Sequence, residues 1–175
     1  ARPHTRNYLP EFCILGFNTM MRPGEMLNLE WDRVDFDTKV VRLEVEHTKG
    51  KARRLVPLND DACAALVRLR RICDDRFADT PYVFTHTSPR LFGKRVGSVA
   101  KVFETAVKSA GIAHATPHAL RHTGITEGVH APDANVVDIS KIAGHKDLRT
   151  TMGYVHTSPQ RLHDAVAKLP NVNNS

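Results

Sequence analysis

Four short groups of residues carry side chains that can bind an anion or transfer a proton. They are Arg22-Pro23-Gly24-Glu25, the turn around Lys49, His118-Ala119-Leu120-Arg121, and Ala143-Gly144-His145 with Tyr154 nine residues further on. Arginine is a permanent, forked cation that suits phosphate. Histidine and lysine can transfer protons, and a deprotonated tyrosine is a nucleophile. Taken singly, each residue also has a structural interpretation, such as a solvated arginine, a charged hairpin edge, a loop histidine or a core aromatic.

Three histidines at intervals of four raise the question of a metal site. His118 and His122 share a face of the expected helix, as two zinc ligands do, and His114 precedes them. No glutamate stands between them in the zinc-protease pattern, and no nearby cysteine completes a ligand set. We therefore predict no metal at these histidines.

Composition limits the class of protein. The 175 residues are 41% hydrophobic and 25% charged, which is typical of a folded domain with its own core. The formal net charge of +6 favours an anionic partner, most commonly nucleic acid. No apolar run approaches the ~20 residues that span a bilayer, and no charged n-region precedes an apolar h-region. The three cysteines are odd in number and lack metal-ligand spacing, so we expect small buried hydrophobes in a reducing cytoplasm.

Apolar periodicity predicts an α+β domain, mainly helical, with a small three-stranded antiparallel sheet near the N-terminus packed on a helical bundle. Strands are expected at Val34–Phe36, Val40–Val45 and Arg53–Leu58. Helices are expected over residues 9–20, 26–29, 59–77, 96–110, 116–129 and 136–142, after Asp147 through Tyr154, and over 158–169.

In combination, the four groups resemble the tyrosine site-specific recombinase, or phage integrase, family from about Leu9 to Leu169. The HxxR pattern alone is weak support, whereas four boxes in the right order are highly specific. Ala143 stands where leucine is usual, and Pro23 follows the arginine where the family varies. The matching segments are residues 18–31 for the first arginine box, 49–58 for the lysine hairpin, 116–123 for the second box and 142–156 for the histidine-to-tyrosine segment.

The resemblance implies site-specific recombination, such as integration or excision of a phage or mobile element, through a covalent 3′-phosphotyrosyl intermediate. Arg22 and Arg121 would clamp the scissile phosphate, and His145 would donate a further hydrogen bond. Tyr154 would attack in line. Because a phenol titrates near pH ~10, its proton must be removed with help.

The resemblance also implies the proton transfers. His118 is the expected base, and Lys49, at a hairpin tip, is the expected acid for the leaving 5′-oxygen. Glu25 would buttress the arginine, and His156 would support the tyrosine segment. Because the phosphotyrosyl bond stores the energy of the cleaved bond, the reaction needs no ATP, metal or other cofactor.

Double-stranded DNA is the partner that the resemblance implies, together with further protomers in a tetramer on DNA and, in some systems, accessory DNA-bending proteins. Seven basic residues are the expected contacts to the DNA backbone, which position a duplex without reading its sequence. They are Lys51, Arg53, Arg54, Lys94, Arg95, Lys101 and Lys146.

We expect residues 1–169 to form an N-terminally truncated catalytic domain without the family's DNA-binding domain, followed by a loose tail at 170–175. Three other functions remain open: a degenerate DNA-binding module, a type IB topoisomerase, and a helical interaction domain without catalysis. A covalent DNA adduct, and the DNA end that it holds, would distinguish them.

Overall fold

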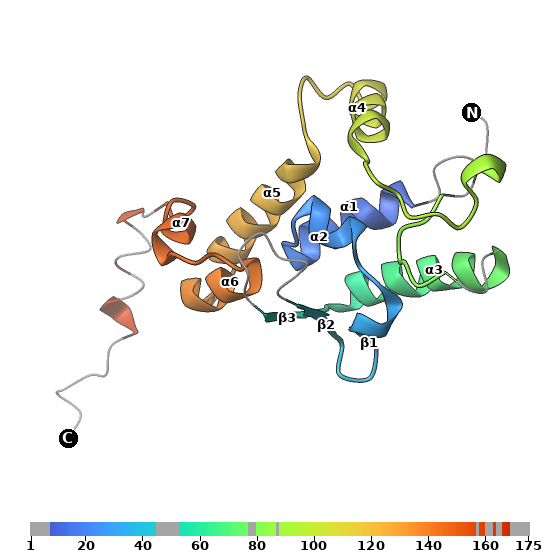
Figure 1. Cartoon of the computed structure of the whole chain (residues 1–175). Helices are drawn as coiled ribbons and strands as arrows, with labels where there is room; N and C mark the ends of the chain where they lie inside the picture. The colour runs from blue at the N-terminus through green and yellow to red at the C-terminus, as the bar shows by residue number, and fades with distance from the viewer. Residues whose placement is uncertain are drawn as a thin grey trace.

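Helix α1 (Leu9–Thr19) lies at the centre of the fold, packed against α5 (Pro117–His130) and α3 (Asp60–Arg76) (Figure 1). The computed structural model describes residues 8–44, 53–76, 80–86, 88–156, 158–159, 163 and 166–168. Phe12 and Leu15 of α1 are almost fully buried, as the apolar run predicts. The mainly helical class with one small antiparallel sheet is confirmed.

The sheet follows the order β1 (Val34–Asp35), β2 (Val40–Leu43) and β3 (Arg54–Pro57), with antiparallel neighbours. Val41 pairs with Val56 in register, and both are fully buried against the core that includes α1 and α3. All three predicted strands are present but shorter than expected. The connection between β2 and β3, which carries Lys49 and Lys51, lies outside the described residues.

Helix α3 begins where the sequence predicts it, because Asn59 Oδ1 accepts a hydrogen bond of 3.0 Å from the backbone N–H of Ala62. The predicted apolar stripe faces the core, with Leu66, Leu69 and Cys73 buried. Before it come α2 (Pro23–Leu27) and the 3₁₀ turn η1 (Trp31–Arg33). In the view of Figure 1 the sheet lies below α2, and α2 packs against α1.

The predicted helix over residues 96–110 begins later than expected, and α4 covers Ala100–Ser109. Val96 is buried in an extended segment, where its N–H donates to Phe84 O at 2.9 Å beside a bridge between Thr85 and Arg95. Pairing with a distant segment has overridden the helical spacing of Val96 and Val99. The short turn η3 (Pro89–Leu91) lies in the connection between Thr85 and Arg95.

Helices α6 (Val136–Ala143) and α7 (Leu148–Met152) pack beside α5. Helix α6 ends at Gly144, as predicted, with a left-handed φ of 72°. Asp147 caps α7 through the N–H of Arg149 at 2.9 Å. Tyr154 was predicted inside this helix, but α7 ends at Met152 and Gly153 is its C-cap. Half of the positions in the predicted helix at 158–169 lie outside the described residues.

Close contact between α1 and α5 depends on Gly124. A Cβ atom at this position would lie 2.2 Å from the carbonyl oxygen of Phe17, so any larger residue would force the helices apart. This contact brings α5, which carries Arg121, against α1, which leads directly into Arg22. No helix in the described part of the chain is long and apolar enough to cross a membrane.

Candidate active site

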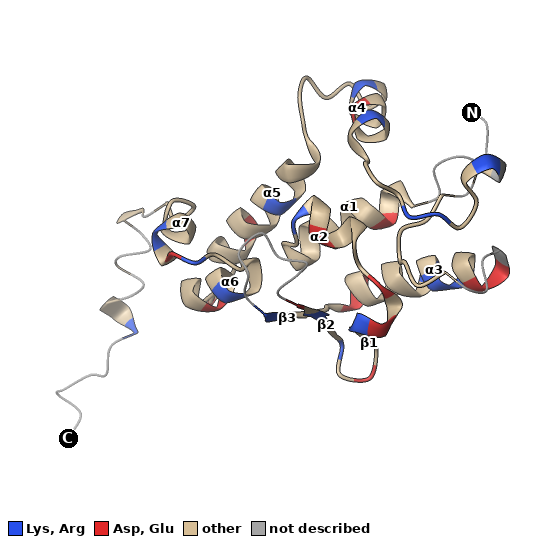
Figure 2. Ribbon diagram, in the orientation of Figure 1, with Lys and Arg blue, Asp and Glu red and all other residues tan. Residues whose placement is uncertain are grey.

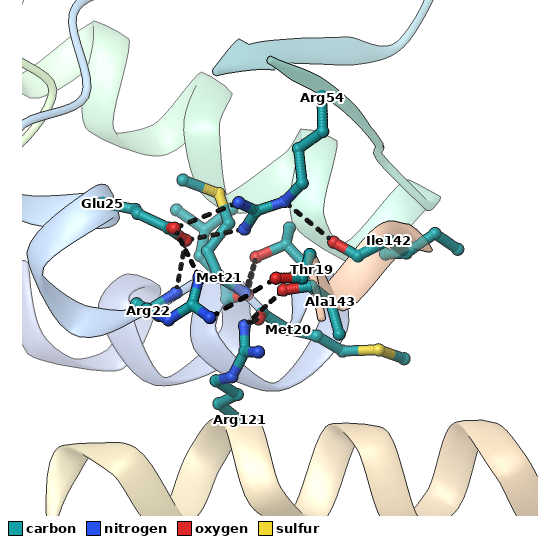
Figure 3. A network of polar contacts seen from close by, with 11 residues as sticks. Thr19, Met20, Met21, Arg22, Glu25, Arg54, Arg121, Ile142 and Ala143 are labelled. Atoms are coloured by element: carbon teal, nitrogen blue, oxygen red, sulfur yellow. Dashed lines mark hydrogen bonds and ion pairs between the residues drawn. The ribbon is translucent and has the colours of Figure 1, made fainter. Parts of the chain in front are cut away.

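Three arginines from distant parts of the sequence converge on one region (Figure 3). Arg22 precedes α2, Arg54 lies in β3, and Arg121 projects from α5 towards the end of α6. Further basic residues lie nearby along the chain in α6 and α7, as Figure 2 shows. The region is therefore a site where several permanent positive charges are held by the fold.

Glu25 is the single carboxylate in this network and is only 2% exposed. It accepts hydrogen bonds from Arg54 Nη1 and Nη2 at 3.0 and 2.7 Å, from Arg22 Nη1 at 3.0 Å and from the Arg22 backbone N–H at 2.8 Å. Burial alone would raise the pKa of Glu25. The hydrogen bonds and charge of Arg54, with those from Arg22, outweigh burial and lower the pKa. The carboxylate stays ionised and fixes both guanidiniums.

Arg54 connects β3 to the end of α6. Its Nε donates to the carbonyl oxygen of Ile142 at 3.1 Å, and its side chain is 9% exposed. A Cβ at position 144 would lie 2.8 Å from Arg54 Nη1, so Gly144 is required both for this approach and for its left-handed φ. The sequence placed Arg54 among the DNA-backbone contacts, and the structure gives its guanidinium Glu25 and Ile142 as partners.

Arg121 is buried, with 7% exposure, and donates from Nη1 to the carbonyl oxygens of Met20 and Ala143, the latter at 2.8 Å. Burial lowers its pKa to about 10, and the charges of Arg22 and Arg54 act in the same direction. It therefore remains a cation at neutral pH. Arg22, whose Nη2 lies 3.5 Å from Gly144 O, is a like charge beside it. A bound anion would relieve this repulsion.

His145 lies in the connection between α6 and α7 and shares a hydrogen bond of 2.7 Å between its Nδ1 and Thr151 Oγ1. Burial, followed by the charges of Arg121, Arg22 and Arg54, lowers the pKa of His145 to about 4. The imidazole is therefore neutral at physiological pH. With Nδ1 bound to Thr151, Nε2 is the nitrogen available for an outside partner.

Tyr154 lies beside both His145 and α5. Its ring is nearly parallel to that of His145, at 15° with 6.4 Å between centroids, and its hydroxyl oxygen is 2.6 Å from His122 Nδ1. The aromatic ring packs on the cluster around Ile125 and Val129 of α5. Hydrophobic packing thus holds the ring while the hydroxyl reaches the surface.

His156 follows on the same segment and is held by a histidine that the sequence did not single out. Its backbone N–H lies 3.4 Å from His130 Nε2, and the two rings stack with centroids 5.8 Å apart. His130 Nδ1 is 2.7 Å from the carbonyl oxygen of Thr126 in the preceding turn of α5. This pair anchors the chain beyond Tyr154 to the C-terminal end of α5.

A model of the phage integrase family matches residues 5–161. The chain belongs to this family. Among its curated relatives, tyrosine recombinase XerC of Corynebacterium glutamicum is 31% identical over 172 residues, which is 96% of this chain and 53% of that protein. Tyrosine recombinase XerD of Rhizobium meliloti is 31% identical over 67% of this chain and 38% of its own length. The chain thus spans about half the length of the first of these relatives.

Solved structures of phage integrase family proteins share the fold. The XerA recombinase superposes with a TM-score of 0.68 at 27% identity, covering 90% of this chain and 55% of that one. The Tn1549 transposon integrase gives a TM-score of 0.71 at 19% identity, covering 91% and 59%. The catalytic domain of bacteriophage HP1 integrase gives 0.65 at 24% identity and covers 98% and 88%.

Of the residues that the sequence predicts for an integrase site, Arg22, Glu25, Arg121, His145 and Tyr154 lie together. His118 is exposed in the first turn of α5 and makes no hydrogen bond with Tyr154. Lys49 and Lys51 fall outside the described residues. The described residues contain no cluster of three potential metal ligands.

The remaining DNA-backbone candidates are exposed. Arg53 pairs with Glu44 at 2.7 Å, and Arg95 donates to Asn28 and lies over the ring of Tyr82 at 5.8 Å. Lys94, Lys101 and Lys146 lie at the surface. Sequence interpretation missed His122 and Thr151 as parts of the site. The position of His122 four residues after His118 was a usable signal, because residues i and i+4 lie on the same helix face.

Proposed function

We propose that this chain cleaves and rejoins DNA strands through a covalent 3′-phosphotyrosyl intermediate at Tyr154, in the service of site-specific recombination. One observation carries the proposal: Arg22 and Arg121 converge beside His145 and Tyr154, with the repulsion between the arginines unrelieved by a second carboxylate among the described residues. Family membership supports the same activity.

In the proposed step, Tyr154 Oη attacks the scissile phosphorus and loses its proton. The bond from phosphorus to the 5′-oxygen breaks, and that oxygen gains a proton as it leaves. Attack by a different 5′-hydroxyl reverses the step and joins new strands. No bond energy is lost to water, so no external energy source enters the balance.

Arg22 and Arg121 stabilise the charge that develops on the non-bridging oxygens, since preorganised cations act strongly on a phosphoryl transition state. Neutral His145 donates from Nε2 to the same phosphate. In this assignment the Thr151 hydroxyl donates to Nδ1, which leaves the imidazole proton on Nε2. Lys49 remains the proposed acid for the leaving 5′-oxygen.

Double-stranded DNA is the proposed substrate, and a tetramer of protomers on two duplexes is the proposed assembly. The solved Tn1549 integrase is described in complex with circular intermediate DNA, and XerH recombinase as bound to its difH substrate. The positive net charge of this chain suits the same class of ligand.

The test starts from a duplex library with a randomised core and fixed arms. A nick is placed so that the short strand carrying the freed 5′-hydroxyl diffuses away and traps the adduct. We expect the intact protein to form an adduct that survives denaturation, whose 3′-linked DNA can be sequenced to give the preferred site. The Tyr154→Phe variant should fold and bind DNA but form no adduct, because only one hydroxyl is lost.

Three outcomes contradict the proposal: no adduct with any library DNA, an adduct in the phenylalanine variant, or attachment to the 5′ end. If the protein relaxes supercoiled DNA but never exchanges the cleaved strands of the selected duplex, its activity is that of a topoisomerase instead.

A further inference from the structure

The hydroxyl of Tyr154 contacts His122, one helical turn after the histidine that the sequence favours as base. The distance from Oη to Nδ1 is 2.6 Å, which is short for a neutral hydroxyl hydrogen bond. The two rings lie 5.7 Å apart at 35°. His118 and His122 share one face of α5. The position of Tyr154 after the end of α7 therefore decides which of the two histidines its hydroxyl contacts.

We infer that His122, rather than His118, accepts the Tyr154 proton during attack on DNA. The inference rests on the proposed function and names a further catalytic residue for it. In this step the Oη–H bond breaks and an Nδ1–H bond forms on His122, while the freed electron pair on Oη attacks phosphorus. His122 returns the proton to Tyr154 when the phosphotyrosyl bond is resolved.

Geometry excludes the other histidine beside the tyrosine. His145 stacks on Tyr154, but its Nδ1 is committed to Thr151, and its place beside Arg121 and Arg22 suits a donor to the phosphate. A base must present a lone pair to the proton it removes, and His122 Nδ1, at hydrogen-bond distance from Tyr154 Oη, does so when the imidazole carries its proton on Nε2.

The surroundings of His122 leave its imidazole open to water. It is exposed on α5, so water can carry away or resupply its proton. The titratable and charged groups around it are Tyr154 and His145 from the α7 side, and His118 and Arg121 on its own helix. The proton acceptor therefore lies on the exposed face of α5, next in sequence to the buried Arg121.

The first test uses the nicked duplex that the library selection returns. His122→Asn keeps an oxygen that can accept the tyrosine hydrogen bond but cannot take up a proton at neutral pH. We expect single-turnover adduct formation to fall by about 100-fold or more near pH 7, the usual contribution of a positioned base. Its rate should keep rising with pH towards the range of a free phenol, whereas the wild-type rate reaches a plateau.

His114→Asn is the matched control, because it alters an exposed histidine before α5 that lies outside the site. It should keep the wild-type rate and pH profile. A His122→Asn variant with the wild-type profile would overturn the inference, since the contact would then only hold the hydroxyl. The inference also fails if His118→Asn, and not His122→Asn, removes the plateau.

A second measurement needs no DNA. In the ¹⁵N spectrum of the 175-residue chain at neutral pH, His122 should carry its proton on Nε2 and show a hydrogen-bonded Nδ1. Tyr154→Phe should shift the Nδ1 resonance of His122 and leave His114 unchanged. If the resonance does not move, the contact is absent and the inference is wrong, even where the wild type forms adducts. If it moves but the wild type forms no adduct, the proposed function fails instead.

Discussion

Arg54 and Glu25 form a two-pronged ion pair, with Nη1 and Nη2 of the guanidinium 3.0 and 2.7 Å from Oε1 and Oε2 of the carboxylate. The same carboxylate binds Arg22, so one acidic side chain connects the β-hairpin to the first arginine of the site. Because Arg54 also holds the Ile142 carbonyl, the hairpin, α2 and the end of α6 form one polar unit.

Removal of the Glu25 charge should destabilise the fold. Glu25→Gln leaves two buried or half-buried guanidiniums without their carboxylate, and loss of one partner from a buried pair costs about 3 kcal/mol or more. Urea unfolding monitored by circular dichroism measures the free energy of unfolding. Glu104→Gln, in an exposed pair with Lys108, is the control and should show no measurable change. Equal free energies of unfolding for the two variants would show that the Glu25 ion pairs do not stabilise the fold.

Stability should fall as the pH drops from about 6.5 towards 4. Burial and the arginines lower the pKa of His145 to about 4, whereas an unfolded histidine titrates near ~6.5. Between these values the unfolded state binds more protons than the folded state, so stability rises with pH. Glu25, whose pKa is also lowered, adds stability above the unfolded pKa of ~4.3 that is lost as the pH falls through its folded pKa.

Urea midpoints at a series of pH values give this slope, and His145→Gln should flatten it between pH ~6.5 and ~4. A variant with the same slope as the wild type would assign the dependence to other groups.

Thr151 should set the tautomer of His145. Thr151 is fully buried, and its hydroxyl is bound to Nδ1. Thr151→Val preserves shape but removes the hydroxyl, so the Nε2–H tautomer loses its stabilising partner. One hydrogen bond is worth about 1 kcal/mol, so adduct formation should slow by about 3- to 10-fold, with DNA binding unchanged. Thr151→Ser should restore the rate, and an equal defect in both variants would point to packing instead.

The two arginines should not tolerate lysine. Arg121→Lys keeps the charge but loses the fork that reaches both backbone carbonyls and a phosphate. We expect single-turnover cleavage to slow by about 100-fold or more, the typical effect of one lost oxyanion donor. Arg22→Lys should behave alike. Arg149→Lys, at an exposed position on α7, is the control and should cleave normally. Near wild-type cleavage by Arg121→Lys would remove it from the phosphate clamp.

Sulfur in place of the bridging 5′-oxygen should rescue a variant that lacks the acid. A thiol titrates near pH ~8.5 and can leave as the thiolate, so it needs no proton. Lys49→Ala should therefore cleave ordinary DNA slowly and the sulfur-substituted strand at nearly the wild-type rate. Arg121→Ala should gain no such rescue, because its charge acts on the non-bridging oxygens. An equal Lys49→Ala defect on both substrates would leave Lys49 as a contact residue.

The sequence alone determined the helical class, the three strands and the residues that form most of the site. These features are local: short β-branched runs mark β2 and β3, Asn59 and Asp147 cap their helices, and Gly144 ends α6. The resemblance to the phage integrase family predicted the two arginines, His145 and Tyr154, because the four motifs combine specific residue types in a specific order.

Tertiary structure alone decided how these residues face one another. Val96 lies in an extended segment because its N–H pairs with Phe84, which no local spacing indicates. Arg54 turns inward because the buried carboxylate of Glu25 needs a cation, and only the fold brings β3 to α2. Tyr154 meets His122 rather than His118 because α7 ends before the tyrosine and the ring packs on α5. Each of these choices depends on a contact between distant segments, and such contacts are set by packing and not by neighbours in sequence.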